Sequence, residues 1–406
     1  MMKRMDPVQT GACAPQGFAA GSIFAGVKPD GKKDDVAIIC SEVPAAAAAV
    51  YTRNLVKAAC LHVTKEHLED GMLQAVIVNS GNANVAARNG RLHAEEMAAA
   101  AAKKLNLAPD MVAVASTGVI GQELPAWKIV AAVENIELSK EGSGKAAAAI
   151  MTTDTVMKTT ETSFQIGDVT CTMGGICKGS GMIHPNMGTM LCFVTCDAAI
   201  TPNMLEKALQ DVVRTTFNRI SVDGDTSTND MCLILSNGMA KNALIDVEGE
   251  AYDIFKNALH EVMETLAIKI ASDGEGASRL ITVTVHDAET EEQAETLARS
   301  VASSSLLKAA MFGSDANWGR VMCAMGYSGA KFDPEIVDIA FASEKGSIEV
   351  CHQGREVLFD EEKASEILKE DAVVIDVTLH EGDQSATCWG CDLTYDYVSI
   401  NGDYRS

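Results

Sequence analysis

Hydrophobic residues along this chain form short runs that are separated by polar segments. The runs are bounded by turn-forming residues, a pattern typical of buried β-strands. The strands predicted in this way span residues 35–41, 75–79, 112–116, 280–286, 337–342 and 373–379. One further run, 190–195, follows a glycine-rich segment and is also predicted to be a buried strand.

Between these strands, hydrophobic residues recur with the period of an α-helix. Segment 94–105 is rich in Ala, and segment 202–217 has Thr201 as its predicted N-cap and Pro202 in its first turn. A third hydrophobic stripe runs through 254–270. The alternation of strands and helices predicts a mixed α/β fold.

Composition narrows the possible functions. The 406 residues are 47% hydrophobic and 22% charged, which is typical of a globular chain with one large core or two domains. A formal charge of −23 argues against binding to nucleic acid, whose phosphates require a basic surface. The N-terminus lacks the apolar stretch of a secretory signal, and we find no apolar run long enough to span a membrane. A cytoplasmic protein that acts on small molecules is therefore expected.

The pattern of cysteines also favours the cytoplasm. There are twelve, and most lie within hydrophobic runs, as reduced core thiols do. Cys388 and Cys391 form a C-x-x-C pair, but two more ligands at recognisable spacing are missing. We therefore expect neither a metal nor another cofactor.

The segment from Lys178 to Ala198 carries the most specific chemistry. If the backbone breaks between Gly188 and Thr189, one residue gains a hydroxyl nucleophile and an α-amine that can act as its base. The pKa of such an amine is about 7.7 to 8.0, so it can accept a proton at neutral pH. Gly188 has no Cβ and tolerates the strained backbone that this attack needs. The alternative interpretation is an ordinary glycine-rich loop leading into a core strand.

Eight ordered sequence blocks resemble the ornithine acetyltransferase family of arginine biosynthesis, whose members are self-cleaving N-acetylornithine:glutamate acetyltransferases. The resemblance extends from residue 14 to the C-terminus, with two small departures: the family commonly has Ala where this chain has Gly188, and often Thr where it has Ser406. The blocks are 78–84, 115–121, 152–155, 178–191, 217–230, 274–280, 313–320 and 400–406.

The resemblance implies a fold, a cleavage pattern and an assembly. It implies two interlocked mixed α/β domains with stacked sheets, similar to the N-terminal nucleophile hydrolases but connected differently. An α fragment, 1–188, and a β fragment, 189–406, are expected to stay associated, with two copies of each in a heterotetramer. No nucleic acid or membrane partner is expected.

The resemblance also implies roles for particular residues. Thr117 and Gly118 follow the predicted strand 112–116 and correspond to the oxyanion pair, although Ser-Thr-Gly alone is most often a turn. Lys178 would face a substrate carboxylate and Glu275 would project from a glycine-flanked turn; each would otherwise be interpreted as solvated. Thr153 remains an alternative to Thr152 after a one-residue shift. The expected substrate-binding residues are Thr152, Lys178, Thr189, Glu275, Asn401 and Ser406.

The implied reaction is a ping-pong transfer in which Thr189 takes the acetyl group from N-acetylornithine and passes it to glutamate. Two alternatives stay open: an aminopeptidase or amidase with water as acceptor, and an uncleaved binding protein. The sequence also leaves open whether acetyl-CoA is a second donor. His184 and the aspartates Asp223, Asp225 and Asp230 are interpreted as structural.

Overall fold

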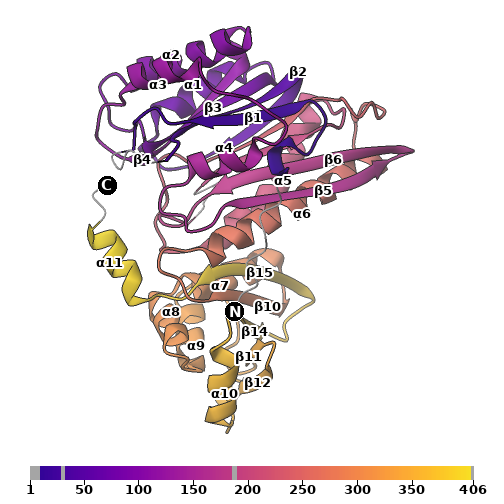
Figure 1. Cartoon of the computed structure of the whole chain (residues 1–406). Coiled ribbons are helices and arrows are strands. Elements are labelled where there is room, and N and C mark those ends of the chain that lie inside the picture. The colour runs from indigo at the N-terminus through magenta and orange to yellow at the C-terminus, as the bar shows by residue number, and fades with distance from the viewer. Residues whose placement is uncertain (1–9, 29–32, 185–189, 404–406) are drawn as a thin grey trace.

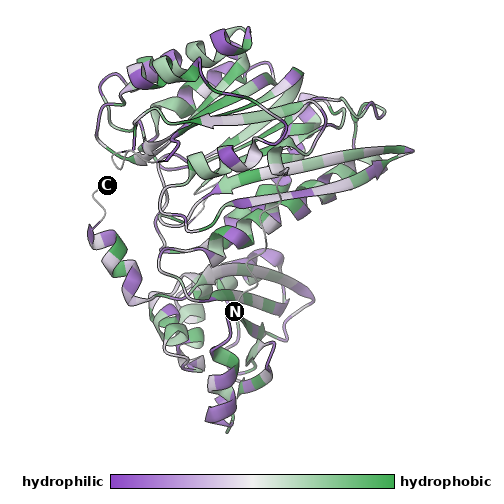
Figure 2. Ribbon diagram, viewed as in Figure 1, coloured by the Kyte–Doolittle hydropathy of each residue, from purple (hydrophilic) through white to green (hydrophobic). Residues whose placement is uncertain are grey.

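The computed structural model describes residues 10–28, 33–184 and 190–403. Within these ranges the chain forms two mixed β-sheets with helices packed on their faces (Figure 1). Hydrophobic residues concentrate on the strands and on the inner sides of the helices (Figure 2). The predicted mixed α/β fold with stacked sheets is confirmed.

The first sheet is built from both halves of the chain. Its two central strands, β9 and β7, lie between strands from the N-terminal half, and β1 (Phe18–Ile23) pairs outside the main order with β2. All residues of β7 and β9 are buried, which explains their unbroken hydrophobic sequences. The order is β4 (Val112–Val119), β3 (Met72–Asn82), β2 (Val36–Tyr51), β9 (Met231–Ser236), β7 (Leu191–Cys196), β6 (Val169–Lys178) and β5 (Lys158–Ile166).

The second sheet is built almost entirely from the C-terminal part of the chain. Its central strands alternate buried and partly exposed residues, as expected for strands with one fully packed face. The order is β13 (Arg355–Glu356), β12 (Gly346–His352), β11 (Asp338–Ser343), β14 (Ala372–Thr378), β10 (Leu280–Ala288), β15 (Gln384–Cys391) and β8 (Ile220–Ser221).

Helices form the layers that separate and cover the sheets. The first group packs on one face of the first sheet: α1 (Ala59–His67), α2 (Gly90–Leu105), α3 (Ala126–Val133) and α4 (Ser143–Ile150). On the opposite face lie α5 (Pro202–Thr215) and α6 (Glu250–Ser272). Side chains of α6 share one core with Trp389 and Cys391 of the second sheet, so α6 joins the two sheets.

Four helices share a core with the second sheet. The C-terminal helix and three 3₁₀ helices complete the described part of the chain. The helices are α7 (Glu291–Ser303), α8 (Ser305–Phe312), α9 (Trp318–Gly326) and α10 (Glu361–Leu368). The C-terminal helix α11 (Tyr395–Asp403) leaves the second sheet and runs along the side of the molecule towards the lobe that contains β4 (Figure 1). The 3₁₀ helices are η1 (Gly11–Cys13), η2 (Pro109–Met111) and η3 (Phe217–Arg219).

Every predicted strand and helix coincides with an observed element, although several bounds differ. The prediction that Thr201 is the N-cap of α5 is right in position, but its side chain makes no capping hydrogen bond. The strand predicted at 35–41 continues to Tyr51, because the Ala-rich run 45–49 pairs with both β3 and β9. Sequence periodicity alone does not distinguish such an Ala run from a helix.

The twelve cysteines are all free, and all but Cys40 and Cys323 are buried. Cys388 packs in the core of the second sheet, whereas Cys391 packs towards α6. The two thiols of the C-x-x-C pair therefore lie on opposite faces of β15 and do not converge on one ion. Among the described residues, no helix is both long and apolar enough to cross a membrane.

Candidate functional site

Thr117 and Gly118 lie near the end of β4, where the pairing of β4 with β3 becomes irregular. Gly118 pairs with Gly81 of β3, and the register shifts at Asn82. Gly118 has φ +130°, and a Cβ atom there would lie 2.3 Å from the carbonyl carbon of Gly81. Only glycine fits this close approach. The backbone amide of Gly118 and the hydroxyl of Thr117 are thereby held at the end of the sheet.

Lys178 brings a buried ammonium group to the same place. It is the last residue of β6, and its Nζ donates a hydrogen bond to Thr117 Oγ1 at 3.3 Å. The side chain is only 9% exposed. Burial lowers the pKa of Lys178, and the carboxylates of Asp154 and Glu275 oppose this. A buried cation whose hydrogen bond goes to a neutral hydroxyl is well prepared to bind an anion.

Asp154 connects the loop that carries Thr152 to the residue after Lys178. Asp154 Oδ1 accepts hydrogen bonds from the backbone amide of Gly179 and from Lys158 Nζ, both at 2.7 Å. Asp154 Oδ2 accepts from the backbone amide of Thr152 at 3.1 Å. These bonds fix the Thr152 loop beside the end of β6. Thr153 lies in the same loop, so the geometry leaves the choice between the two threonines open.

Glu275 lies in the turn after α6 and faces the same segment. Its backbone amide donates to the carbonyl oxygen of Ser180 at 2.9 Å. A Cβ atom at Gly181 would lie 2.3 Å from Glu275 Cδ, so the carboxylate rests directly on a residue without a side chain. Asn401 of α11 donates from Nδ2 to Glu275 Oε2 at 2.7 Å. Gly276, with φ +68°, allows the close approach of α11 at this point.

The structure thus gathers the predicted residues around one segment, Lys178–Gly181. Thr117 contacts its start, the Thr152 loop is bonded to Gly179 through Asp154, and Glu275 with Asn401 lies against Gly181. Gly188, Thr189 and Ser406 lie outside the described residues.

Sequence reasoning missed the buried charges that support this segment. Lys158 is fully buried and pairs with Asp154 at 2.7 Å and with Asp273 at 2.6 Å. Although burial raises the pKa of Asp154, the Lys158 and Lys178 ammonium groups outweigh it and hold that pKa below its usual range. The four-residue spacing of Asp154 and Lys158 was the sequence signal for an ion pair between them. Only the fold shows that Asp273 also pairs with Lys158.

Asp230, interpreted from the sequence as structural, is also deeply buried. It is 1% exposed, and its Oδ2 has no hydrogen-bond partner among the described residues. Burial raises the pKa of Asp230 well above its usual range, despite hydrogen bonds from Ser227 and Thr52. It directly precedes β9, whose first residue, Met231, donates its amide hydrogen to the carbonyl oxygen of Met190 at 2.9 Å. A buried carboxyl group with a raised pKa therefore lies beside the start of β7.

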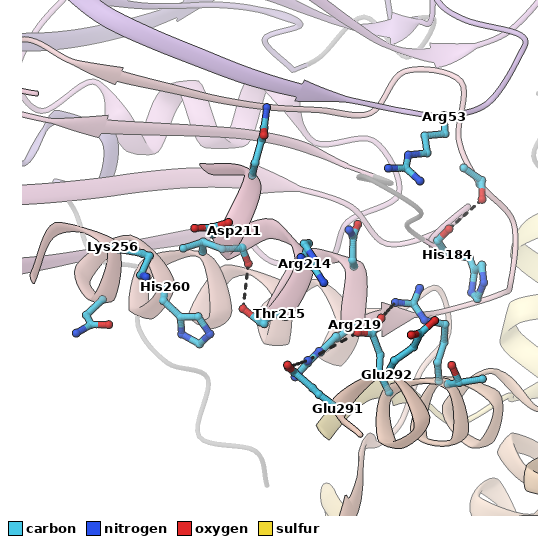
Figure 3. Close-up of a pocket in the computed structure, with 18 residues that line it drawn as sticks. Arg53, His184, Asp211, Arg214, Thr215, Arg219, Lys256, His260, Glu291 and Glu292 are labelled. Carbon is cyan, nitrogen blue, oxygen red and sulfur yellow. Dashed lines mark hydrogen bonds and ion pairs between the residues drawn. The ribbon is translucent and has the colours of Figure 1, made fainter. Parts of the chain in front are cut away.

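His184 belongs to a different environment. It lines a polar cavity of about 1110 Å³ between α5, α6 and α7, together with several charged side chains (Figure 3). Its Nδ1 lies 3.1 Å from Ser221 Oγ, and burial together with the nearby Arg299 lowers its pKa. The residues that line this cavity do not include Thr117, Lys178 or Glu275. His184 therefore does not face the segment that those residues share.

Asp223 supports the turn before His184. Its carboxylate accepts hydrogen bonds from the backbone amides of Met182 at 2.6 Å and Ile183 at 2.9 Å. Asp225 donates its own amide to Asp223 Oδ1 at 3.2 Å. These contacts agree with the structural interpretation of both aspartates.

Comparison with known proteins places the chain in a family. Residues 19–406 match the ArgJ family. The arginine biosynthesis bifunctional protein ArgJ of Symbiobacterium thermophilum is 50% identical over 406 residues, which cover 99% of this chain and 100% of that protein. The protein of the same name from Caldanaerobacter subterraneus is 48% identical over 395 residues, covering 97% and 98%. A crystal structure of the Bacillus halodurans ArgJ protein aligns with a TM-score of 0.50 at 46% identity, over 52% of this chain and 98% of that one.

The two-sheet fold and the polar site define a mixed α/β enzyme, and the matches over nearly the whole chain identify it as an acyltransferase of arginine biosynthesis. The chain belongs to the ArgJ family.

Proposed function

We propose that the protein transfers an acetyl group from N-acetylornithine to glutamate through an acetyl ester on Thr189. The observation that carries this proposal is the contact between Lys178 and Thr117 at the end of β4, beside the Gly118 amide. These groups offer two hydrogen-bond donors for a developing oxyanion and one cation for a substrate carboxylate. They flank the connection that leads from β6 to β7, in which Thr189 lies.

In the first half-reaction, Thr189 Oγ attacks the acetyl carbonyl carbon of N-acetylornithine, and the α-amine of Thr189 takes the hydroxyl proton. The hydroxyl of Thr117 and the amide of Gly118 hold the tetrahedral oxyanion. The C–N bond then breaks, and ornithine leaves with the proton. In the second half-reaction, the amine of glutamate attacks the ester, and N-acetylglutamate leaves while Thr189 regains its proton.

We propose that Thr152, Lys178, Glu275, Asn401 and Ser406 bind the amino-acid part of the substrates. Both substrates carry an α-carboxylate, which suits Lys178. Glu275 is held by hydrogen bonds with Ser180 and Asn401, which supports its proposed role as the acceptor for the substrate's amine or amide. One pocket can therefore hold the donor and the acceptor in turn.

The proposed nucleophile requires cleavage between Gly188 and Thr189. Two observations support such a cut. First, β7 and β9 of the β fragment lie between β2 and β6 of the α fragment, so the fragments would stay interlocked without a covalent bond. Second, 98% of the Bacillus halodurans chain aligns with only 52% of this one, a share close to that of a β fragment beginning at Thr189. We further propose that two α and two β fragments form a heterotetramer.

Denaturing electrophoresis with intact mass measurement tests the cleavage. The wild type should give fragments 1–188 and 189–406, Thr189→Ala should stay full length and inactive, and Thr189→Ser should cleave slowly. An uncleaved wild type with full activity would contradict the mechanism, and an uncleaved inactive one would favour a binding protein.

Activity assays identify the acetyl donor and the acetyl acceptor. Ornithine release that needs glutamate supports transfer, whereas full-rate release with water alone favours an amidase. The curated relatives are named bifunctional, so we propose acetyl-CoA as a second donor. Formation of N-acetylglutamate from acetyl-CoA and glutamate tests this directly.

A further inference from the structure

Four side chains of the second sheet converge far in the fold from the proposed active site. Asp338 begins β11, Glu349 and His352 lie on β12, and His380 follows β14. His352 Nδ1 lies 3.1 Å from Asp338 Oδ1 and 3.0 Å from Glu349 Oε1. His380 Nε2 lies 2.7 Å from Asp338 Oδ2. One carboxylate thus bridges two imidazoles, and a second carboxylate completes the cluster.

A β-bulge places Glu349 and His352 on one face. In a regular strand, residues three apart point to opposite faces. Here Ile339 pairs with Cys351 while Ala340 pairs with Glu349, so β12 contains one extra residue. Val350 and Cys351 are both buried, and their neighbours on either side both point outwards. The bulge therefore redirects the two polar side chains towards Asp338.

The ligand atoms have the spacing that a small cation requires. In a tetrahedral zinc site with bonds of about 2.1 Å, neighbouring ligand atoms lie about 3.4 Å apart. The ligand atoms of Asp338, Glu349 and His352 all lie within 4.8 Å of one another. Small rotations of exposed side chains would bring them to the required distances. His380 is not part of this group of three, but its Nε2 lies 2.7 Å from the other oxygen of Asp338, Oδ2. With His380 the cluster would offer two imidazoles and two carboxylates, a donor set that suits zinc and similar transition metals.

The electrostatics of the cluster also favour a cation. The single Nδ1 of His352 faces two carboxylate oxygens but carries at most one hydrogen to donate. A third carboxylate, Asp287 Oδ2, lies 4.0 Å from His380 Nδ1.

We propose that Asp338, Glu349, His352 and His380 form a binding site for one divalent transition-metal ion of the zinc class. The site joins β11, β12 and the end of β14, and it is separate from the residues around Lys178–Gly181. Bound metal would stabilise this edge of the second sheet and leave acetyl transfer unchanged. The expectation of no metal rested on the C-x-x-C pair, which is not involved.

Titration calorimetry with zinc chloride tests the proposal on the metal-free, untagged, full-length protein. A Cys323→Ser background removes the exposed thiol, and excess magnesium suppresses weak binding to the acidic surface. We expect about one zinc ion per chain. The double variant His352→Ala/His380→Ala should bind at least about tenfold more weakly.

The matched control is His286→Ala. His286 pairs with a single carboxylate, Asp376, at 3.2 Å and is similarly exposed. This variant should keep wild-type zinc affinity, and zinc should raise the melting temperature of the wild type and of this control but not of the double variant. No stoichiometric binding by the wild type, or equal binding by the double variant, would overturn the proposal. Unchanged melting temperatures of the metal-free variants confirm that each is folded.

Discussion

At the scale of single residues, buried charges determine the shape of the proposed site. The side chains of Lys158 and Asp154 are both completely buried, and each has partners in the surrounding loops. Removing one member of such a pair leaves an uncompensated charge in the interior. The pair therefore holds the Thr152 loop and Gly179 in place through Asp154.

We predict that Asp154→Asn destabilises the protein by about 3 to 5 kcal/mol at neutral pH. Because the pKa of Asp154 is lowered in the folded state, its stabilising contribution is complete above the unfolded value of 3.8 and is lost as the pH falls through the folded value. Urea unfolding of the wild type and variant at several pH values measures this difference. It should shrink in acid, and the exposed control Asp168→Asn should show no such difference.

Thr117 supplies one of the two proposed oxyanion donors. We predict that Thr117→Ala lowers kcat by about 100-fold, the scale expected for losing one preorganised donor, while KM changes little. Steady-state kinetics with N-acetylornithine and glutamate measures both constants. A raised KM with unchanged kcat would instead make Thr117 a substrate-binding residue, and Thr117→Ser should retain most of the activity.

At the scale of elements, α11 contributes to the proposed site but adds no buried residue to the core. Within Tyr395–Asp403 no residue is buried, yet Asn401 fixes Glu275. We predict that Asn401→Ala raises KM for the amino-acid substrates about tenfold, equivalent to about 1.4 kcal/mol, with a nearly unchanged melting temperature. Substrate kinetics and thermal unfolding of the same samples measure these effects. A large fall in melting temperature would mean that α11 has a structural role instead; Ser399→Ala on the same helix is the control.

Seven of the strands and three of the helices were predicted from sequence, because hydrophobic periodicity depends on local neighbours; the other elements in the described residues were not predicted. The pairing of β9 with β2 was not, since it joins segments almost two hundred positions apart. The bulge in β12 was missed for a related reason: the extra residue is visible only against its partner strand. Of the proposed site, the sequence predicted residues that the structure gathers around Lys178–Gly181, whereas the Lys158–Asp273 contact depends on where α6 ends.

At the scale of the whole molecule, the first sheet holds the two proposed fragments together. The β fragment supplies the two central strands of this sheet. Its helix α6 packs against both sheets and connects their cores. We predict that fragments 1–188 and 189–406 elute together from size exclusion in native buffer and separate only in denaturant. The uncleaved Thr189→Ala variant should elute at the same volume. Separation of the wild-type fragments in native buffer would contradict the interlocked arrangement.

The acetyl ester on Thr189 is the centre of the proposed mechanism, and mass spectrometry tests it most directly. The purified enzyme is incubated with N-acetylornithine in the absence of glutamate and then denatured rapidly in acid. We predict that the 189–406 fragment gains one acetyl group on Thr189, with about one equivalent of ornithine released. Adding glutamate should remove the acetyl group as N-acetylglutamate appears. An unmodified fragment in an enzyme that still transfers acetyl to glutamate would contradict the mechanism.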